Sequence, residues 1–65
     1  MRIDLNGTPV ETDAGSLAAL IEERGFDAAS VATAMDGQFV PRPARAATAL
    51  RDGAKIEVLS PMQGG

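Results

Sequence analysis

Alternating apolar and polar residues at the beginning of the chain predict a β-hairpin. Ile3 and Leu5 alternate with polar neighbours, and a period of two is typical of a half-buried strand. The Asn6-Gly7 pair that follows favours a two-residue type I′ turn, because both turn residues need a positive φ. A second strand is therefore expected over residues 8–10, with its apolar face on the same side as Ile3.

An apolar stripe that begins at Leu17 repeats at i, i+3 and i+4 and predicts a short amphipathic helix. Ser16 stands directly before the stripe and is suited to the N-cap position. Gly25 suits the left-handed position that ends many helices, and Phe26 is then placed to fold back onto Ile21. These signals place one helix between Ser16 and Gly25.

The second half of the chain predicts strands and turns with little helix. Asp36-Gly37 indicates a second hairpin turn. Residues 41–50 are rich in alanine and contain two prolines, so we expect a loop there with at most one helical turn over residues 46–50. The strands predicted from alternation and turn signals are residues 31–35, 38–40 and 55–59.

The predicted order of elements is β-β-α-β-β-β, which indicates an α+β fold. A chain this short can bury one helix only by laying it across a single sheet. By analogy, a hairpin, a helix and a last strand before a free tail suggest the β-grasp, or ubiquitin-like, fold with a mixed sheet. We expect residues 1–59 to form this domain and residues 60–65 to form a flexible C-terminal tail.

The composition limits the chemistry that the chain can perform by itself. Its 65 residues contain no cysteine and no histidine, which excludes a thiolate nucleophile, an imidazole base and a cysteine–histidine metal site. Glu22 and Glu23 are adjacent on the predicted helix and point about 100° apart, so they do not form a carboxylate pair. We therefore expect a protein that is not an enzyme and that binds no metal ion or cofactor itself.

The charge balance argues against nucleic-acid binding. The net charge is −3; residues 1–30 hold six acidic and two basic residues (−4), whereas residues 31–65 hold three acidic and four basic residues (+1). No apolar run reaches the roughly 20 residues of a membrane-spanning helix, and the N-terminus lacks the pattern of a signal peptide. A cytoplasmic protein without a membrane segment is expected.

The chain stops at Gly64-Gly65, and this ending points to carrier chemistry. No side chain surrounds the last carboxylate, so a narrow channel in another enzyme can admit it, and residues 60–65 can span at most about 20 Å. A carboxylate is ionised and unreactive at neutral pH, so another enzyme must activate it, usually as an acyl-adenylate formed from ATP. Displacement of AMP by a sulfur nucleophile would then give a thiocarboxylate on Gly65.

Several short motifs are spread over nearly the whole chain. In these motifs the sequence resembles the sulfur-carrier proteins of thiamine biosynthesis, which are the small ubiquitin-like partners of thiazole synthase. They are the hairpin at residues 1–7, the Gly15 loop, Asp36-Gly37 leading into Val40-Pro41-Arg42, the turn at 50–53, the strand at 55–58 and the terminal Gly64-Gly65.

The resemblance implies a defined set of partners. An adenylating enzyme similar to ubiquitin-activating enzymes would use ATP and Mg²⁺ to activate Gly65, with Gly64 giving access to the active site. Sulfur would come from a separate donor such as a cysteine desulfurase, and thiazole synthase would receive it. Because the chain has no cysteine, it cannot hold the sulfur as a persulfide itself.

A second hypothesis concerns partner docking. Phe39, Leu59 and Met62 are expected to form an exposed apolar patch beside the tail, although scattered surface apolar residues are common and Phe39 can equally belong to the core. Arg42 is a weaker candidate for contact with a partner carboxylate, since a solvated arginine at a strand end is the more common case.

Other readings of the glycine tail remain open at this stage. The chain can serve as a sulfur carrier of another pathway, such as the small subunit of molybdopterin synthase or a carrier for cysteine or tRNA thiolation. A ubiquitin-like protein modifier would instead form isopeptide bonds to lysines. A plain β-grasp interaction module would use the tail for no chemistry.

Overall fold

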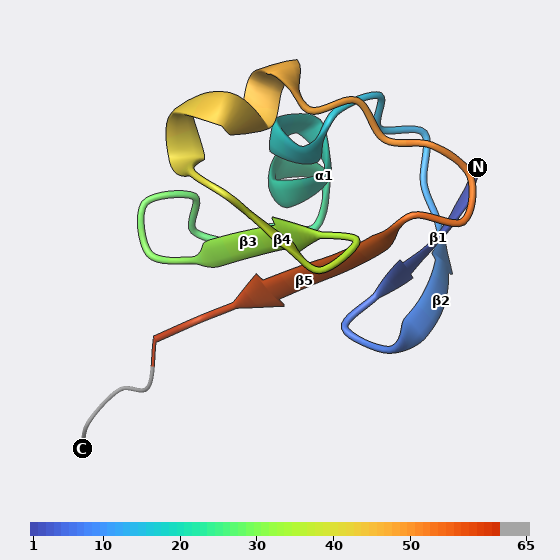
Figure 1. The fold of residues 1–65 in the computed structure, drawn as a ribbon, viewed down its shortest axis with the longest axis horizontal. Helices are drawn as coiled ribbons and strands as arrows, with labels where there is room; N and C mark the ends of the chain where they lie inside the picture. The colour runs from blue at the N-terminus through green and yellow to red at the C-terminus, as the bar shows by residue number, and fades with distance from the viewer. Residues whose placement is uncertain (62–65) are drawn as a thin grey trace.

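Residues 1–61 are described by the computed structural model, and they form a five-stranded sheet with its helical segments on one side (Figure 1). The elements along the chain are β1 (Arg2–Leu5), β2 (Thr8–Glu11), α1 (Leu17–Glu23), β3 (Ala32–Met35), β4 (Gln38–Val40), the 3₁₀ helix η1 (Arg42–Ala47) and β5 (Lys55–Leu59).

The last strand, β5, lies in the centre of the sheet, whose order is β2-β1-β5-β3-β4. It pairs in parallel with β1 and antiparallel with β3, while β1–β2 and β3–β4 are antiparallel hairpins. Both hairpins turn through the predicted pairs, since Asn6-Gly7 and Asp36-Gly37 all have positive φ. One helix across a mixed sheet confirms the predicted α+β, β-grasp arrangement.

The helix begins and ends where the sequence predicts. The Oγ atom of Ser16 accepts a hydrogen bond from the amide of Ala19 at 3.1 Å. At the other end, Gly25 has a φ of 74°, its amide donates to the carbonyl of Glu22, and the amide of Phe26 donates to the carbonyl of Ile21. This pair of bonds is a Schellman motif, which satisfies the last carbonyl groups of the helix.

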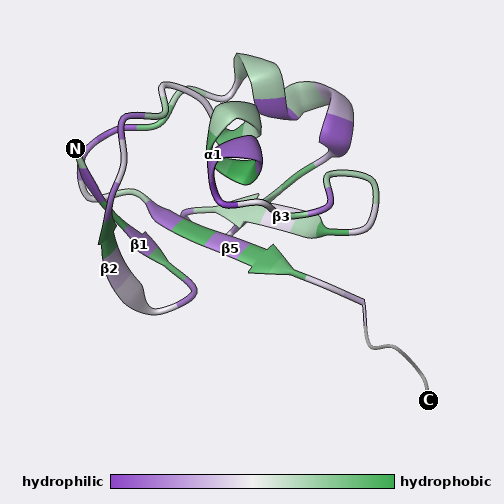
Figure 2. Cartoon of the chain, turned by 180° about the vertical axis from the view of Figure 1, so that it is seen from behind, coloured by the Kyte–Doolittle hydropathy of each residue, from purple (hydrophilic) through white to green (hydrophobic). Residues whose placement is uncertain are grey.

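The apolar core lies between α1 and the face of the sheet that α1 covers. Figure 2 shows hydrophobic and hydrophilic residues alternating along β5. Ile56 and Val58 are buried, whereas Lys55 and Glu57 are exposed. No described helix covers the opposite face, which we call the open face. The buried apolar residues are Ile3, Leu5, Ala14, Leu17, Leu20, Ile21, Val40, Leu50, Ala54, Ile56 and Val58.

The helical turn predicted over residues 46–50 is wrong in position and length. The structure has a 3₁₀ helix over Arg42–Ala47 instead, with Pro43 near its start, where a missing N–H has no intrahelical partner to lose. Residues 48–50 are extended because they pair with the segment before α1: the amide of Leu17 donates to the carbonyl of Thr48, and the amide of Leu50 donates to that of Gly15. Tertiary pairing therefore ends the helix at residue 47.

Gly53 and Gly15 form a matched pair for testing backbone strain. Gly53 has a φ of 85°, whereas the φ of Gly15 lies outside the left-handed region, and an added Cβ meets no atom within 4 Å at either position. Gly53→Ala is expected to lower the free energy of unfolding by about 1–2 kcal/mol. Gly15→Ala should be neutral or raise it by up to about 1 kcal/mol, since the unfolded chain loses freedom. Urea unfolding of both variants measures the difference, and equal values would contradict a strain effect at Gly53.

Candidate functional site

The predicted reactive residues Gly64 and Gly65, and the predicted docking residue Met62, lie outside the described residues. The described part fixes where the tail begins. Strand β5 ends at Leu59, and Ser60 and Pro61 are exposed beyond it. Because β5 is the central strand, the chain enters the tail from the most firmly paired position in the sheet.

The side chain of Asn6 extends the pairing of β5 towards the tail. Its Nδ2 donates to the carbonyl of Val58 at 3.1 Å, and its Oδ1 accepts from the amide of Val58 at 2.9 Å. The β1–β5 ladder itself reaches only Leu5 opposite Ile56. The carboxamide therefore takes the place of a further backbone pair and holds β5 close to its last residue. The Asn6-Gly7 pair predicts Asn6 only as a turn residue, and no local pattern indicates its bonds to Val58.

The open face carries a patch of exposed apolar residues next to the end of β5. Phe39 is 71% exposed and Leu59 is 61% exposed. The register places Leu59 opposite Ala32 and Phe39 opposite Ala34, so two small side chains lie between the two large ones. The result is a hollow of about 130 Å³ with alanines at its floor. We call Phe39, Leu59, Ala32 and Ala34 the open-face patch.

The structure thus brings two of the three predicted docking residues together. The alternative that Phe39 belongs to the core is wrong, because Phe39 is largely exposed, whereas its neighbour Val40 on β4 is buried. Large apolar residues that stay exposed side by side are more informative than single ones, since they mark surfaces for protein contact.

Charged residues border the patch on the same face. Asp4 pairs in register with Lys55, and Glu57 lies between Lys55 and Leu59 along β5. A shallow hollow of about 580 Å³ runs over this border. An apolar centre with a polar rim is the usual anatomy of a protein–protein interface.

Asp36 fixes the β3–β4 hairpin, and with it Phe39, against the start of β5. One carboxylate oxygen accepts from the amide of Lys55 at 3.0 Å, and the other pairs with Arg51. The bond from the Lys55 amide is the main cause that lowers the pKa of Asp36, and Arg51 lowers it further. The carboxylate therefore stays ionised and keeps the two sides of the patch in register.

Several hydroxyl and carboxylate groups of the described residues are engaged in structural hydrogen bonds. Ser16 caps α1, Ser30 donates to Asp27, and Thr12 donates to Glu23 at 2.7 Å. Within residues 1–61, no three acidic, histidine or cysteine side chains gather closely enough to hold a metal ion. The helices in this range are too short and too polar to cross a bilayer.

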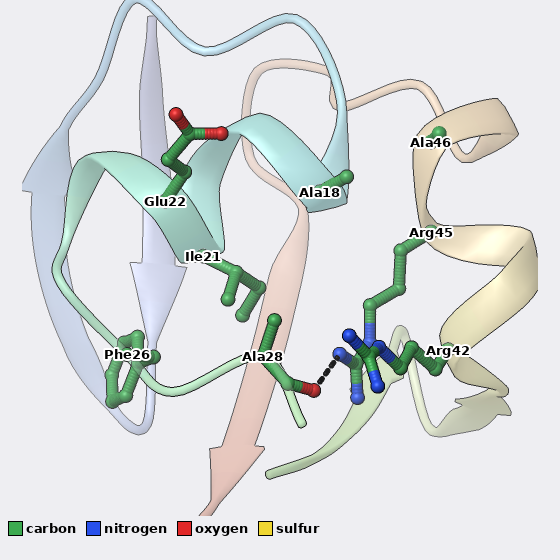
Figure 3. Close-up of a pocket in the computed structure, with 8 residues that line it drawn as sticks. All are labelled: Ala18, Ile21, Glu22, Phe26, Ala28, Arg42, Arg45 and Ala46. Carbon is green, nitrogen blue, oxygen red and sulfur yellow. Dashed lines mark hydrogen bonds between the residues drawn. The ribbon is translucent and has the colours of Figure 1, made fainter. Parts of the chain in front are cut away.

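Arg42 and Arg45 do not belong to the open face. Both lie on η1 and line a separate hollow beside α1 (Figure 3). Arg42 is exposed, as expected from the sequence, whereas Arg45 is buried, which the sequence did not predict. The weaker hypothesis of an Arg42 partner contact therefore concerns a surface away from the open-face patch.

Two solved structures and one family model are similar to this chain. The sequence model of the ThiS family matches residues 3–65. The crystal structure of the thiamine biosynthesis protein (ThiS) from Geobacter metallireducens is similar with a TM-score of 0.84 and 32% identity, covering 100% of both chains. An NMR structure of a thiamine biosynthesis protein from the same organism has a TM-score of 0.83 and 29% identity, covering 100% of this chain and 88% of that one. No curated protein sequence matches significantly.

Proposed function

The chain belongs to the ThiS family of small sulfur carriers, and from this premise we propose that Gly65 carries sulfur as a thiocarboxylate in thiamine biosynthesis. An adenylating enzyme would activate Gly65, and thiazole synthase would receive the sulfur. The observation that carries the proposal is the family match, which extends through both terminal glycines to residue 65.

The proposed chemistry has two steps: the Gly65 carboxylate is first activated through one of its oxygens, and its carbonyl carbon is then attacked by sulfur. The Gly65 carboxylate attacks the α-phosphate of ATP, and pyrophosphate leaves, which gives a mixed anhydride with AMP. Hydrosulfide supplied by a separate donor then attacks the carbonyl carbon, AMP leaves with the bonding electron pair, and loss of the S–H proton leaves the thiocarboxylate. In this scheme ATP is a substrate of the activating enzyme and Mg²⁺ is its metal cofactor, so the carrier needs no cofactor of its own.

Partner proteins would bind the globular domain and thereby position the tail. We infer that the open-face patch, together with Met62, docks on the activating enzyme. Support comes from Leu59, which is both a patch residue and the last residue of β5. A partner that covers Leu59 is therefore in position to direct the following six residues, which span up to about 20 Å, into its active site.

Intact mass spectrometry tests the proposal. The full chain is incubated with ATP, Mg²⁺, the activating enzyme of the same organism and a sulfide source. Replacement of one oxygen by sulfur, confined to the C-terminal peptide, is the expected result. A control without ATP should show no change. Sulfur elsewhere in the chain, or adducts joined to lysine in place of a thiocarboxylate, would contradict the carrier function.

Leu59→Asp tests the docking surface separately from the tail. Covering an unpaired carboxylate at an apolar interface costs about 1–3 kcal/mol, so kcat/KM for adenylation should fall by about fivefold or more. Ala19→Asp is the matched control, because it adds the same charge at an exposed position near the beginning of α1. ATP–pyrophosphate exchange measures both variants. An unchanged rate for Leu59→Asp would exclude the patch from docking.

A further inference from the structure

A second hollow lies on the helix side of the molecule, between α1, the segment that follows it and η1 (Figure 3). It has a volume of about 300 Å³, at the lower end of the range for ligand sites. Small side chains leave the space open, and Ile21 and Phe26 add larger apolar surface. We call it the helix-side groove; its lining residues are Ala18, Ile21, Glu22, Phe26, Ala28, Arg42, Arg45 and Ala46.

The groove contains a buried positive charge without a carboxylate partner. Arg45 is 4% exposed, and its guanidinium donates to Thr33 Oγ1 at 2.9 Å and to the carbonyls of Ala28 and Val31 at 2.9 and 2.7 Å. All three acceptors are neutral, and within residues 1–61 no carboxylate lies within 4.0 Å of Arg45. Buried charges are usually paired with an opposite charge. Arg45 therefore departs from the usual case, and a carboxylate from a partner could supply the missing negative charge.

Arg42 adds a second positive charge to the same groove. Its guanidinium forms no hydrogen bond or ion pair with any of residues 1–61. The nearby Asp27 forms no ion pair with Arg42 within 4.0 Å, and its carboxylate instead accepts from Ser30 and from the amide of Ala29. These two bonds are the main causes that lower the pKa of Asp27, and the charge of Arg42 makes a smaller contribution.

The charges are arranged along the groove. In Figure 3, both arginine side chains extend from η1 towards Ala28, whereas the carboxylate of Glu22 points away from them on the other side of the apolar floor. An anion is therefore favoured at the η1 end and disfavoured near Glu22. Between the two lies apolar surface with room for a side chain.

We propose that the helix-side groove binds a segment of a partner protein in which an acidic residue adjoins an apolar side chain. The carboxylate would bind Arg42 and face the charge of Arg45, and the apolar side chain would lie against Ile21 and Phe26. Because α1 and η1 cover one side of the sheet and the open-face patch lies on the other, both surfaces are free to bind at the same time. The proposal does not depend on the chemistry of Gly65.

Three capped hexapeptides test the proposal by NMR titration of the full-length ¹⁵N-labelled chain. One alternates leucine and glutamate, one alternates leucine and glutamine, and one alternates serine and glutamate. The first should shift the amide signals of Phe26, Ala28 and Ala46 with saturation, and the other two should bind at least about fivefold more weakly, since each lacks one of the two contacts. Equal binding by either control peptide would overturn the requirement for both groups.

Two arginine variants give the charge dependence of binding. Arg42→Gln removes an exposed guanidinium without a described bond, and it should weaken binding of the leucine–glutamate peptide about fivefold. Arg2→Gln makes the same change of net charge on β1 and should leave binding unchanged. Equal effects of the two variants would overturn the proposal. Shifts of groove signals with protein concentration, or Overhauser contacts between Met62 and Phe26 in the free chain, would assign the groove to a second copy or to the chain's own tail instead.

Discussion

Deletion of Gly65 is expected to abolish sulfur loading and to leave the domain folded. The shortened chain still ends in a glycine carboxylate. Its carboxyl carbon, however, lies about 3.5 Å short of the position in the activating enzyme at which the carboxylate reacts with ATP. A misplacement of about 1 Å can cost about a hundredfold in rate, so the truncated chain should lose at least that factor. Intact mass spectrometry under the conditions given above measures the loss.

Two controls keep this result specific to the terminal carbonyl. Gln63→Ala preserves the length of the tail and should load sulfur at close to the unmodified rate. Thermal unfolding of the truncated chain should be unchanged, because every strand and helix within residues 1–61 ends at or before Leu59. Sulfur incorporation by the truncated chain at the full rate would move the reactive site away from Gly65.

The parts of the fold that local residues determine could be predicted from the sequence. Asn6-Gly7 and Asp36-Gly37 define their turns through positive φ values that few other pairs accept. Ser16 and Gly25 fix both ends of α1 through bonds to residues three or four positions away. These signals need no knowledge of the rest of the chain, and all of them are confirmed.

Features that depend on distant residues could not be predicted. The position of η1 follows from residues 48–50, which pair with the segment before α1 more than thirty positions earlier. Arg45 is buried because its acceptors come from residues 28, 31 and 33, whereas an arginine between alanines gives no local sign of burial. The bond between Asn6 and Val58 joins residues 52 positions apart.

The candidate site also combines features that local residues determine with features that depend on distant residues. Gly64 and Gly65 could be proposed from the sequence because the chemistry proposed for them depends on their own lack of side chains. The neighbouring surface was only half predicted: Phe39 and Leu59 were named, but the alanine floor between them follows from the register of three strands. The helix-side groove had no signal at all, since its walls come from three separate segments.

Leu20→Ala is expected to remove a large part of the stability of the domain. Leu20 is fully buried (0% exposed) and packs α1 against the sheet with Leu17 and Ile21. Such a truncation typically costs about 2–5 kcal/mol, whereas a domain of this length has a free energy of unfolding of roughly 3–10 kcal/mol. The unfolding midpoint should therefore fall by at least about 10 °C in a thermal melt followed by circular dichroism.

Leu59→Ala makes the same chemical change at a position that is 61% exposed, and it should alter stability by less than about 0.5 kcal/mol. The two variants separate the two surfaces of the sheet. Leu20→Ala should lower the melting midpoint and retain activation at temperatures where it stays folded, whereas Leu59→Ala should slow adenylation without changing the midpoint. Equal loss of stability in both variants would mean that Leu59 belongs to the core, and it would remove the physical basis for docking through the open face.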